Sequence, residues 1–485
     1  MSAFTTLDYV VLIAYLAGVT AFGAYLGRKQ KDARDYFLAD RDIPWWAVCF
    51  SVVATETSAL TFISVPATAY GSDFWMLQLT FGYFLGRLVV AGLLLPAYFR
   101  GEVVTAYAAL EQRFGGRVRR FASLVFMVTR AFADGVRLFA TAIPIHLITG
   151  LPYWQAIAIT GVLTLVYTYW GGLRAVVWVD VIQLGIYTFG GLAALYVLLQ
   201  VVPGGWDGIV AAAAPDDKFR IFHFEGGFAD TRWLWTGIIG GGFLSMASHG
   251  VDHLIVQRLL ASPGLRDARK ALIVSGALVI GQFALFLMVG VGLFAYYQGR
   301  TFAAADEVFP RFIVEALPSG VTGLVIAGLL AAAMSTVGSS LNSLASASTH
   351  DLYGPLTKRD DPVHLLRVGR AFTLLWAAIL IGGAMLFQFA AQGTPVVVVA
   401  LQIASFTYGG LLGGFLLATL SRRAREDDAL TGMAAAIVLM ASLWSMQQFG
   451  VIPRLVDTLW FALLGSMVTL AVGEASARLR RREVL

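Results

Sequence analysis

Charged residues and cysteine are scarce in this chain of 485 residues. Asp, Glu, Lys and Arg together make up 13% of it, whereas hydrophobic residues make up 58%. Soluble domains carry roughly 25% charged residues, so this composition excludes an ordinary soluble protein and indicates a membrane protein with several spans. The single cysteine, Cys49, excludes an internal disulfide and a cysteine-based metal cluster.

The motifs of ATP-driven transport and of enzymes are also missing. No GxxxxGK[ST] sequence is present, so any transport must run on a gradient. The longest connection between apolar runs, residues 202–233, is too short for a fused soluble domain. Glu56 and Asp252 could serve as acid and base, but no nucleophile or cofactor motif accompanies them. We therefore expect neither an enzyme nor a cofactor.

Apolar runs long enough to cross about 30 Å of hydrocarbon recur about thirteen times. An alternating strand pattern of about ten residues is absent, so we expect an all-α polytopic membrane protein. The expected spans lie near residues 7–27, 44–70, 75–98, 118–149, 153–172, 176–202, 233–262, 268–298, 319–350, 366–390, 394–420, 429–449 and 455–476.

Basic residues gather in alternate loops between these spans. Lys and Arg are frequent in 28–41, 113–120, 266–270, 358–359 and 422–425 and in the C-terminal tail, whereas the opposite loops carry few. The positive-inside bias therefore predicts an outer N-terminus and a cytoplasmic C-terminus. The bias also explains the net charge of +5, so no nucleic-acid partner is expected.

Two of the expected spans are interrupted halfway along. The second span carries the polar run 54–58, and the seventh carries Gly240-Gly241-Gly242 followed by polar residues. The two spans lie five helices apart, and an odd number of spans inverts the second half, which predicts two five-helix repeats of opposite topology. Glycines that allow close helix packing are the alternative explanation.

This 5+5 organisation, with one helix before the repeats and two after them, predicts five segments. They are residues 1–43 (extra helix and cytoplasmic loop), 44–202 (first repeat), 203–232 (extracellular loop), 233–420 (second repeat) and 421–485 (two last helices and tail).

The stretch 331–351, AAAMSTVGSSLNSLASASTHD, contains far more hydroxyls than a helix facing lipid needs. Ser335, Thr336, Ser339, Ser340 and Ser343 offer hard oxygen ligands suited to a sodium ion. The same hydroxyls could instead join neighbouring helices by hydrogen bonds.

Several of these motifs resemble the sodium:solute symporter family, which includes sodium/sugar, sodium/proline and sodium/sialic acid symporters. The resemblance rests on the stretch 331–351, on the run 169–183 (YWGGLRAVVWVDVIQ) and on Val256-Gln257-Arg258, and it extends in order over nearly the whole chain. It implies a leucine-transporter-type fold with one extra helix before the repeats.

The resemblance also implies a coupling-ion site. Its common sodium would be held by the carbonyls of Ala54, Thr57 and Ala332 and by the hydroxyls of Ser335 and Thr336. A second sodium, found in some members, would use Asp180, Ser335 and Ser339. Gly338 stands where those members offer another hydroxyl, which argues against the second ion. A partner for a cytoplasmic arginine, or a cap at the interface, is the alternative role of Asp180.

The substrate would lie between the two interrupted spans. Sugar recognition of the family's type is not supported, because Leu60 and Thr61 replace its Glu-Gln pair. Glu56 is either a substrate ligand or an acceptor for unwound backbone N–H groups. The candidate substrate-binding residues are Glu56, Ser58, Thr61, Ser245, Ser248, His249, Asp252 and His253.

Charges within the fourth expected span offer a further candidate. Arg130, Asp134 and Arg137 share one helix face, and Arg87 lies in the third span. Sialic acid members hold the substrate carboxylate with an arginine on this fourth span, but Ala133 occupies the matching position. The three residues therefore either bind a substrate anion or lock the helix against its neighbours. His249 and His253 lack a third ligand nearby, so no metal other than sodium is expected.

Together these features predict a sodium-coupled symporter that imports a small polar organic solute by alternating access. A proton-coupled symporter of the same fold and a passive channel or facilitator are the alternatives. We expect sodium, the solute and the lipid bilayer to be the partners, and a monomer to suffice. The expected location is the plasma membrane, the inner membrane if the source is bacterial.

Overall fold

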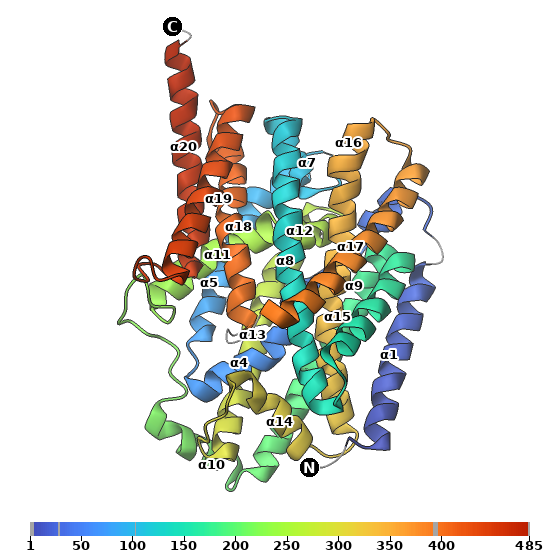
Figure 1. Cartoon of the computed structure of the whole chain (residues 1–485), viewed down its shortest axis with the longest axis vertical. Helices are drawn as coiled ribbons and strands as arrows, with labels where there is room; N and C mark the ends of the chain where they lie inside the picture. The colour runs from blue at the N-terminus through green and yellow to red at the C-terminus, as the bar shows by residue number, and fades with distance from the viewer. Residues whose placement is uncertain (1–3, 28–29, 102, 391–395, 484–485) are drawn as a thin grey trace.

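Helices make up all the regular structure in the described part of the chain. The computed structural model describes residues 4–27, 30–101, 103–390 and 396–483 (Figure 1), so the basic positions 28–29 lie outside it. In these ranges, eight helices are long and apolar enough to cross a membrane, and the bent pair Trp45–Glu56 and Thr61–Gly71 makes a ninth. The predicted all-helical membrane protein is confirmed; the count of thirteen spans stays a prediction.

In the N-terminal half, two of the expected spans form one element, α9, in which two helices follow each other without a loop. α9 runs through both 153–172 and 176–202, and its two parts meet at a kink at Gly172 (φ 54°, ψ −155°). Only glycine adopts this conformation readily. The helices of this half are α1 (Thr6–Leu26), α2 (Ala33–Leu38), α3 (Trp45–Glu56), α4 (Ala59–Gly71), α5 (Met76–Val89), α6 (Leu95–Tyr98), α7 (Ala106–Arg113), α8 (Gly116–Thr149) and α9 (Tyr153–Val201), with the π-helical turn η3 (Val90–Leu94) between α5 and α6.

The C-terminal half contains a second divided span. The expected span 233–262 consists of a π-helical turn and two helices, and the helices are separated by Val251 and Asp252. The elements of this half are α10 (Gly205–Ala213), η5 (Thr236–Gly240), α11 (Gly241–Gly250), α12 (His253–Leu260), α13 (Leu265–Tyr297), α14 (Val308–Glu315), α15 (Val321–Ala347), the π-helical turn η7 (Ser348–Tyr353), α16 (Gly354–Thr357), α17 (Pro362–Ala390), α18 (Val396–Leu420), α19 (Glu426–Gln448) and α20 (Phe461–Glu483).

α15 forms the centre of the bundle. Every residue from 325 to 347 is buried, including all of its hydroxyls. Small residues let α9 approach closely, since a Cβ on Gly328 would lie 3.0 Å from Tyr187 Cα. Because no hydroxyl of this stretch faces lipid, each must find its partner inside the bundle. α1, in contrast, lies at the edge of the bundle with few buried residues (Figure 1).

The basic connections gather at one end of the molecule. Arg113 donates to the Ser421 carbonyl at 2.9 Å, and Arg119 donates to the His350 carbonyl at 2.8 Å. The C-terminus and α16 lie at this end, whereas the N-terminus, α10 and α14 lie at the opposite end (Figure 1). The two ends of the bundle therefore differ in charge.

Candidate functional site

The first interruption frees backbone carbonyls in the middle of a span. α3 stops at Glu56, and Thr57 leaves the helical region (φ −81°, ψ 87°). The Ser58 N–H bonds to the Glu56 carbonyl at 3.1 Å, whereas a continuous helix would direct it to the Ala54 carbonyl. Ala54 thereby loses its helical partner, and the two helices meet at an angle of 59°. Such a freed carbonyl is a suitable ligand for a cation.

The hydroxyls of α15 face this interruption. Thr336 Oγ1 lies 3.4 Å from the Thr55 carbonyl oxygen and 3.2 Å from the Ala332 carbonyl oxygen. Ser339 Oγ lies 3.2 Å from Thr55 Oγ1. The two segments that were expected to hold sodium are therefore in contact, and Thr336 lies at their junction.

A buried carboxylate joins the same helices one turn away. Asp180 of α9 accepts from Ser335 Oγ at 2.6 Å and from Ser51 Oγ at 2.5 Å. The Arg258 guanidinium lies 3.3 Å from the same carboxylate, and it also donates to Ser339 Oγ. The three residues expected for a second sodium are thus close together, but an arginine lies among them. Sequence reasoning missed Arg258 and Ser51 as part of this cluster, although Val256-Gln257-Arg258 was a motif of the resemblance.

Four of the candidate substrate residues form a group at the interruption. Glu56 pairs with Arg87 of α5, and His249 Nε2 lies 3.5 Å from Glu56 Oε2. His249 Nδ1 is 2.8 Å from Ser248 Oγ, and Ser245 Oγ donates to the Tyr83 carbonyl at 2.9 Å. The structure therefore brings Glu56, Ser245, Ser248 and His249 together. Sequence reasoning left Arg87 out of the site, although a charge in an apolar span is a signal of a functional or structural role.

Other polar residues lie on the α4 side of the same interruption. Ser58 is buried at the start of α4, and Thr61 follows it half-buried. Thr57 Oγ1 donates to Gln282 Oε1 of α13 at 2.5 Å. Gln282 is a further residue that the sequence analysis did not single out. These side chains add neutral hydrogen-bonding groups on the α4 side of the interruption.

The charges of α8 form a separate buried network. Arg130 Nε donates to Asp252 Oδ2 at 2.9 Å, and the same guanidinium contacts Asp134 and Tyr408. Tyr408 donates to Asp252 at 2.5 Å. Arg137 has one ion pair, to Asp134 at 3.2 Å, and its side chain is 25% exposed. Arg130 therefore contacts three side chains, whereas Arg137 pairs with one carboxylate and its Nε is buried without a hydrogen-bond partner.

His253 belongs to neither group. Its Nδ1 accepts from the Ala106 N–H at 3.3 Å, and its Nε2 lies 3.2 Å from Ser346 Oγ. Its ring packs against Tyr107 and Phe126. His253 thus joins α12 to α7 and α15, and the structure does not bring it to the other candidate substrate residues.

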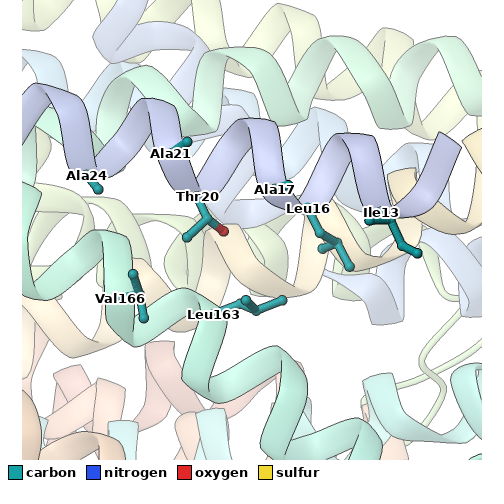
Figure 2. Close-up of a pocket in the computed structure, with 8 residues that line it drawn as sticks. All are labelled: Ile13, Leu16, Ala17, Thr20, Ala21, Ala24, Leu163 and Val166. Atoms are coloured by element: carbon teal, nitrogen blue, oxygen red, sulfur yellow. The ribbon is translucent and has the colours of Figure 1, made fainter. Parts of the chain in front are cut away.

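A groove at the edge of the bundle has mostly apolar walls, unlike these polar groups. It lies between α1 and α9 and has a volume of about 510 Å³ (Figure 2). Its walls offer one hydroxyl, Thr20, and otherwise only apolar side chains, which gives an ion or polar solute little to bind. The lining residues are Ile13, Leu16, Ala17, Thr20, Ala21, Ala24, Leu163 and Val166.

The membrane bundle and its polar centre define an ion-coupled transporter. An interrupted helix faces a hydroxyl-rich helix at mid-span, and the ion pairs Glu56–Arg87 and Asp180–Arg258 lie beside the junction. The chain belongs to the sodium:solute symporter family, whose model matches residues 36–436. It is a sodium-coupled transport protein that works by symport, and not an enzyme.

Known proteins resemble the chain over almost its full length. The sodium/sialic acid symporter NanT of Aliivibrio fischeri is 30% identical, and the match covers 98% of this chain and 94% of that protein. The mouse sodium-coupled monocarboxylate transporter 1 is also 30% identical, over 92% of this chain and 74% of that protein. The solved structure of a sodium-coupled sialic acid symporter in a substrate-bound, outward-open state has a TM-score of 0.88 and 28% identity, with 98% of both chains covered.

Proposed function

We propose that the coupling sodium binds where the α3–α4 interruption meets α15. Its ligands are the carbonyls of Ala54, Thr57 and Ala332 and the hydroxyls of Ser335 and Thr336. The observation that carries this proposal is the Thr336 hydroxyl beside the interruption, where the Ala54 carbonyl has lost its helical partner. Sodium prefers several short, hard oxygen ligands, and this junction supplies them.

The position of Ser335 is compatible with this role. Its hydroxyl donates its one hydrogen to Asp180 at 2.6 Å, which leaves both oxygen lone pairs for a cation. Asp180 thereby orients Ser335 toward the junction, while its own charge is paired with Arg258.

The proposal includes one sodium. A second would require the cluster of Asp180, Ser335 and Ser339, where Arg258 already supplies a positive charge. Gly338 has no room for the hydroxyl that two-sodium relatives offer, because a Cβ there would lie 2.7 Å from Tyr167 Oη. Tyr167 is held in place by its bond to the Met334 carbonyl at 2.8 Å.

We further propose that the solute is a small organic carboxylate and that Arg137 contacts it. Arg137 is partly exposed and has one ion pair, so its remaining donors can bind an anion bidentately. The related proteins named for sialic acid and monocarboxylates both carry acids. Neutral groups of Ser58, Thr61, Ser245, Ser248 and His249 would bind the rest of the solute, whereas the carboxylates of Glu56 and Asp252 are already paired.

The arrangement of the two interruptions supports the 5+5 repeat. α3 and α4 separate at 57–58, and α11 and α12 separate at 251–252, each within the first span of its proposed repeat. We propose residues 44–202 and 233–420 as the two repeats, with 1–43 before them, 203–232 between them and 421–485 after them. The N-terminus is proposed to lie outside and the C-terminus in the cytoplasm.

Sodium binding by single-residue variants tests this function. We expect Thr336→Ala and Ser335→Ala to raise the sodium concentration for half-maximal thermal stabilisation about tenfold, because each loses one ligand worth about 1.4 kcal/mol. Sodium chloride is titrated into purified protein, with choline chloride holding the ionic strength constant. Ser343→Ala is the control, since the Ser343 hydroxyl bonds within α15 to the Ser340 carbonyl. Equal sodium dependence in all four proteins would reject the site.

A further inference from the structure

Four helices meet at one buried ion pair beside the proposed sodium site. Glu56, the last residue of α3, pairs with Arg87 of α5. Arg87 Nη1 donates to Ser275 Oγ of α13 at 2.9 Å. On the other side of the carboxylate, His249 of α11 lies 3.5 Å from Glu56 Oε2. The Arg87 side chain is fully buried, so it is available neither to solvent nor to lipid.

Close packing fixes the arginine in this position. A Cβ on Gly276 would lie 3.1 Å from Arg87 Cδ, so the α13 backbone contacts the arginine stem directly. On the opposite side, a Cβ on Gly86 would collide with the Gly242 carbonyl oxygen of α11. α5 is therefore held tightly between α11 and α13, and Arg87 has little freedom to move away from Glu56.

The position of Glu56 gives this pair a role beyond packing. Glu56 ends α3, and its own carbonyl accepts the Ser58 N–H that would otherwise bond to Ala54. The place where the carboxylate is held thus determines where the helix ends and which carbonyls are freed. A single unpaired charge among membrane helices is strongly unfavourable, so loss of either partner would force this turn to rearrange.

We propose that Arg87 is a positioning residue for the coupling ion. By holding Glu56 it fixes the interruption with the Ala54 and Thr57 carbonyls directed toward Thr336 and Ser335. Glu56 is then part of the framework and does not contact the solute. This inference rests on the proposed sodium site. It predicts that the effects of changing Arg87 and Glu56 on sodium affinity are not additive, as they would be for two independent residues.

A double-mutant cycle tests the proposal with sodium chloride as the probe. Arg87→Gln and Glu56→Gln each leave one buried charge unpaired, and we expect each to raise the half-maximal sodium concentration for thermal stabilisation at least about tenfold. The double variant Glu56→Gln with Arg87→Gln replaces the ion pair by two neutral amides that can hydrogen-bond. We expect its half-maximal concentration to return to within about threefold of wild type. Arg174→Gln is the control and keeps wild-type sodium dependence, because this arginine pairs with Asp42 outside the proposed sodium and solute sites.

The outcomes separate this inference from the sodium site itself. If wild type and Arg174→Gln show no stabilisation by sodium, the proposed site fails. If both proteins are stabilised by sodium, two results would show that Arg87 is not a positioning residue. The first is that the single variants bind sodium like wild type, and the second is that the double variant binds sodium no better than the single variants. Should a single variant not fold, the double variant decides alone: a half-maximal concentration within threefold of wild type supports the proposal, and a larger increase overturns it.

Discussion

At the scale of single residues, Arg130 and Arg137 differ in how completely their charges are paired. Both lie on one face of α8, yet Arg130 contacts Asp252, Asp134 and Tyr408, whereas Arg137 contacts Asp134 alone. A fully engaged arginine stabilises the bundle, because removing it would leave Asp252 without its cation. An incompletely paired and partly exposed arginine is free to recognise an anion.

Replacing Arg137 therefore has a specific expected result. Arg137→Gln should weaken stabilisation by a small monocarboxylate, added in saturating sodium, about tenfold to a hundredfold, because a charge-assisted bond contributes about 1.5–3 kcal/mol. The measurement is a thermal-shift titration with a panel of small monocarboxylates and their uncharged amides. Arg174→Gln is the control, because this arginine is similarly exposed but pairs with Asp42 on the connection before α3. Stabilisation by amides equal to that by acids would contradict the carboxylate assignment.

His249 and His253 show that residue spacing does not predict a shared site across a helix break. His249 and His253 are four apart, and on one continuous helix they would share a face. The helix is interrupted at Val251 and Asp252, so His249 stays beside Glu56 while His253 turns to Ser346 and Ala106. Their spacing therefore could not predict a common site, because the spacing rule holds only within an unbroken helix.

At the scale of elements, the interruptions and kinks determine where polar groups become available. The sequence predicted an interruption within the polar run 54–58 of an apolar span, and α3 ends in this run, at Glu56. It also predicted two separate spans on either side of residues 173–175. The structure has two helices there, which are joined directly at one kinked residue, Gly172, with no loop between them. A glycine in the left-handed half of conformational space can redirect a helix without a loop.

The kink at Gly172 is expected to be intolerant of any side chain. Gly172→Ala would combine a positive φ with a collision between the new Cβ and the Tyr36 carbonyl oxygen. We expect a cost of about 1–3 kcal/mol or more and a lower apparent melting temperature of the purified protein. Gly185→Ala on the same helix, where a Cβ meets no atom within 4 Å, should leave the melting temperature unchanged or slightly raised. Equal melting temperatures for the two variants would show that the kink is not needed.

At the scale of the whole molecule, the distribution of charge between the two ends predicts the orientation in the membrane. The basic segments near Arg113, Arg119 and Lys358 lie at the end that holds the C-terminus (Figure 1). α10, which follows α9 in the connection 202–233, and the N-terminus lie at the other end (Figure 1). Because basic loops are retained on the cytoplasmic side during membrane insertion, the end with the C-terminus is expected to face the cytoplasm. The N-terminus, at the other end, is then expected to lie outside.

Labelling of intact cells checks this orientation. A cysteine introduced at the exposed Glu225 should react with a membrane-impermeant maleimide, whereas one at the exposed Arg422 should react only after the cells are opened. The unaltered chain is the background control, because its one cysteine, Cys49, is fully buried. Labelling of position 422 in intact cells, with 225 protected, would reverse the proposed topology.

The sequence by itself determined the class of protein, the apolar spans, the polar interruption and the hydroxyl-rich helix. These are local properties, set by composition and by short patterns that the bilayer imposes on any chain that crosses it. Only the tertiary structure decided which charges are paired: Glu56 with Arg87, Asp180 with Arg258, and Asp252 with Arg130. Each of these pairs joins different helices, and a buried charge takes whichever partner helix packing brings within a few ångströms, which sequence spacing does not encode.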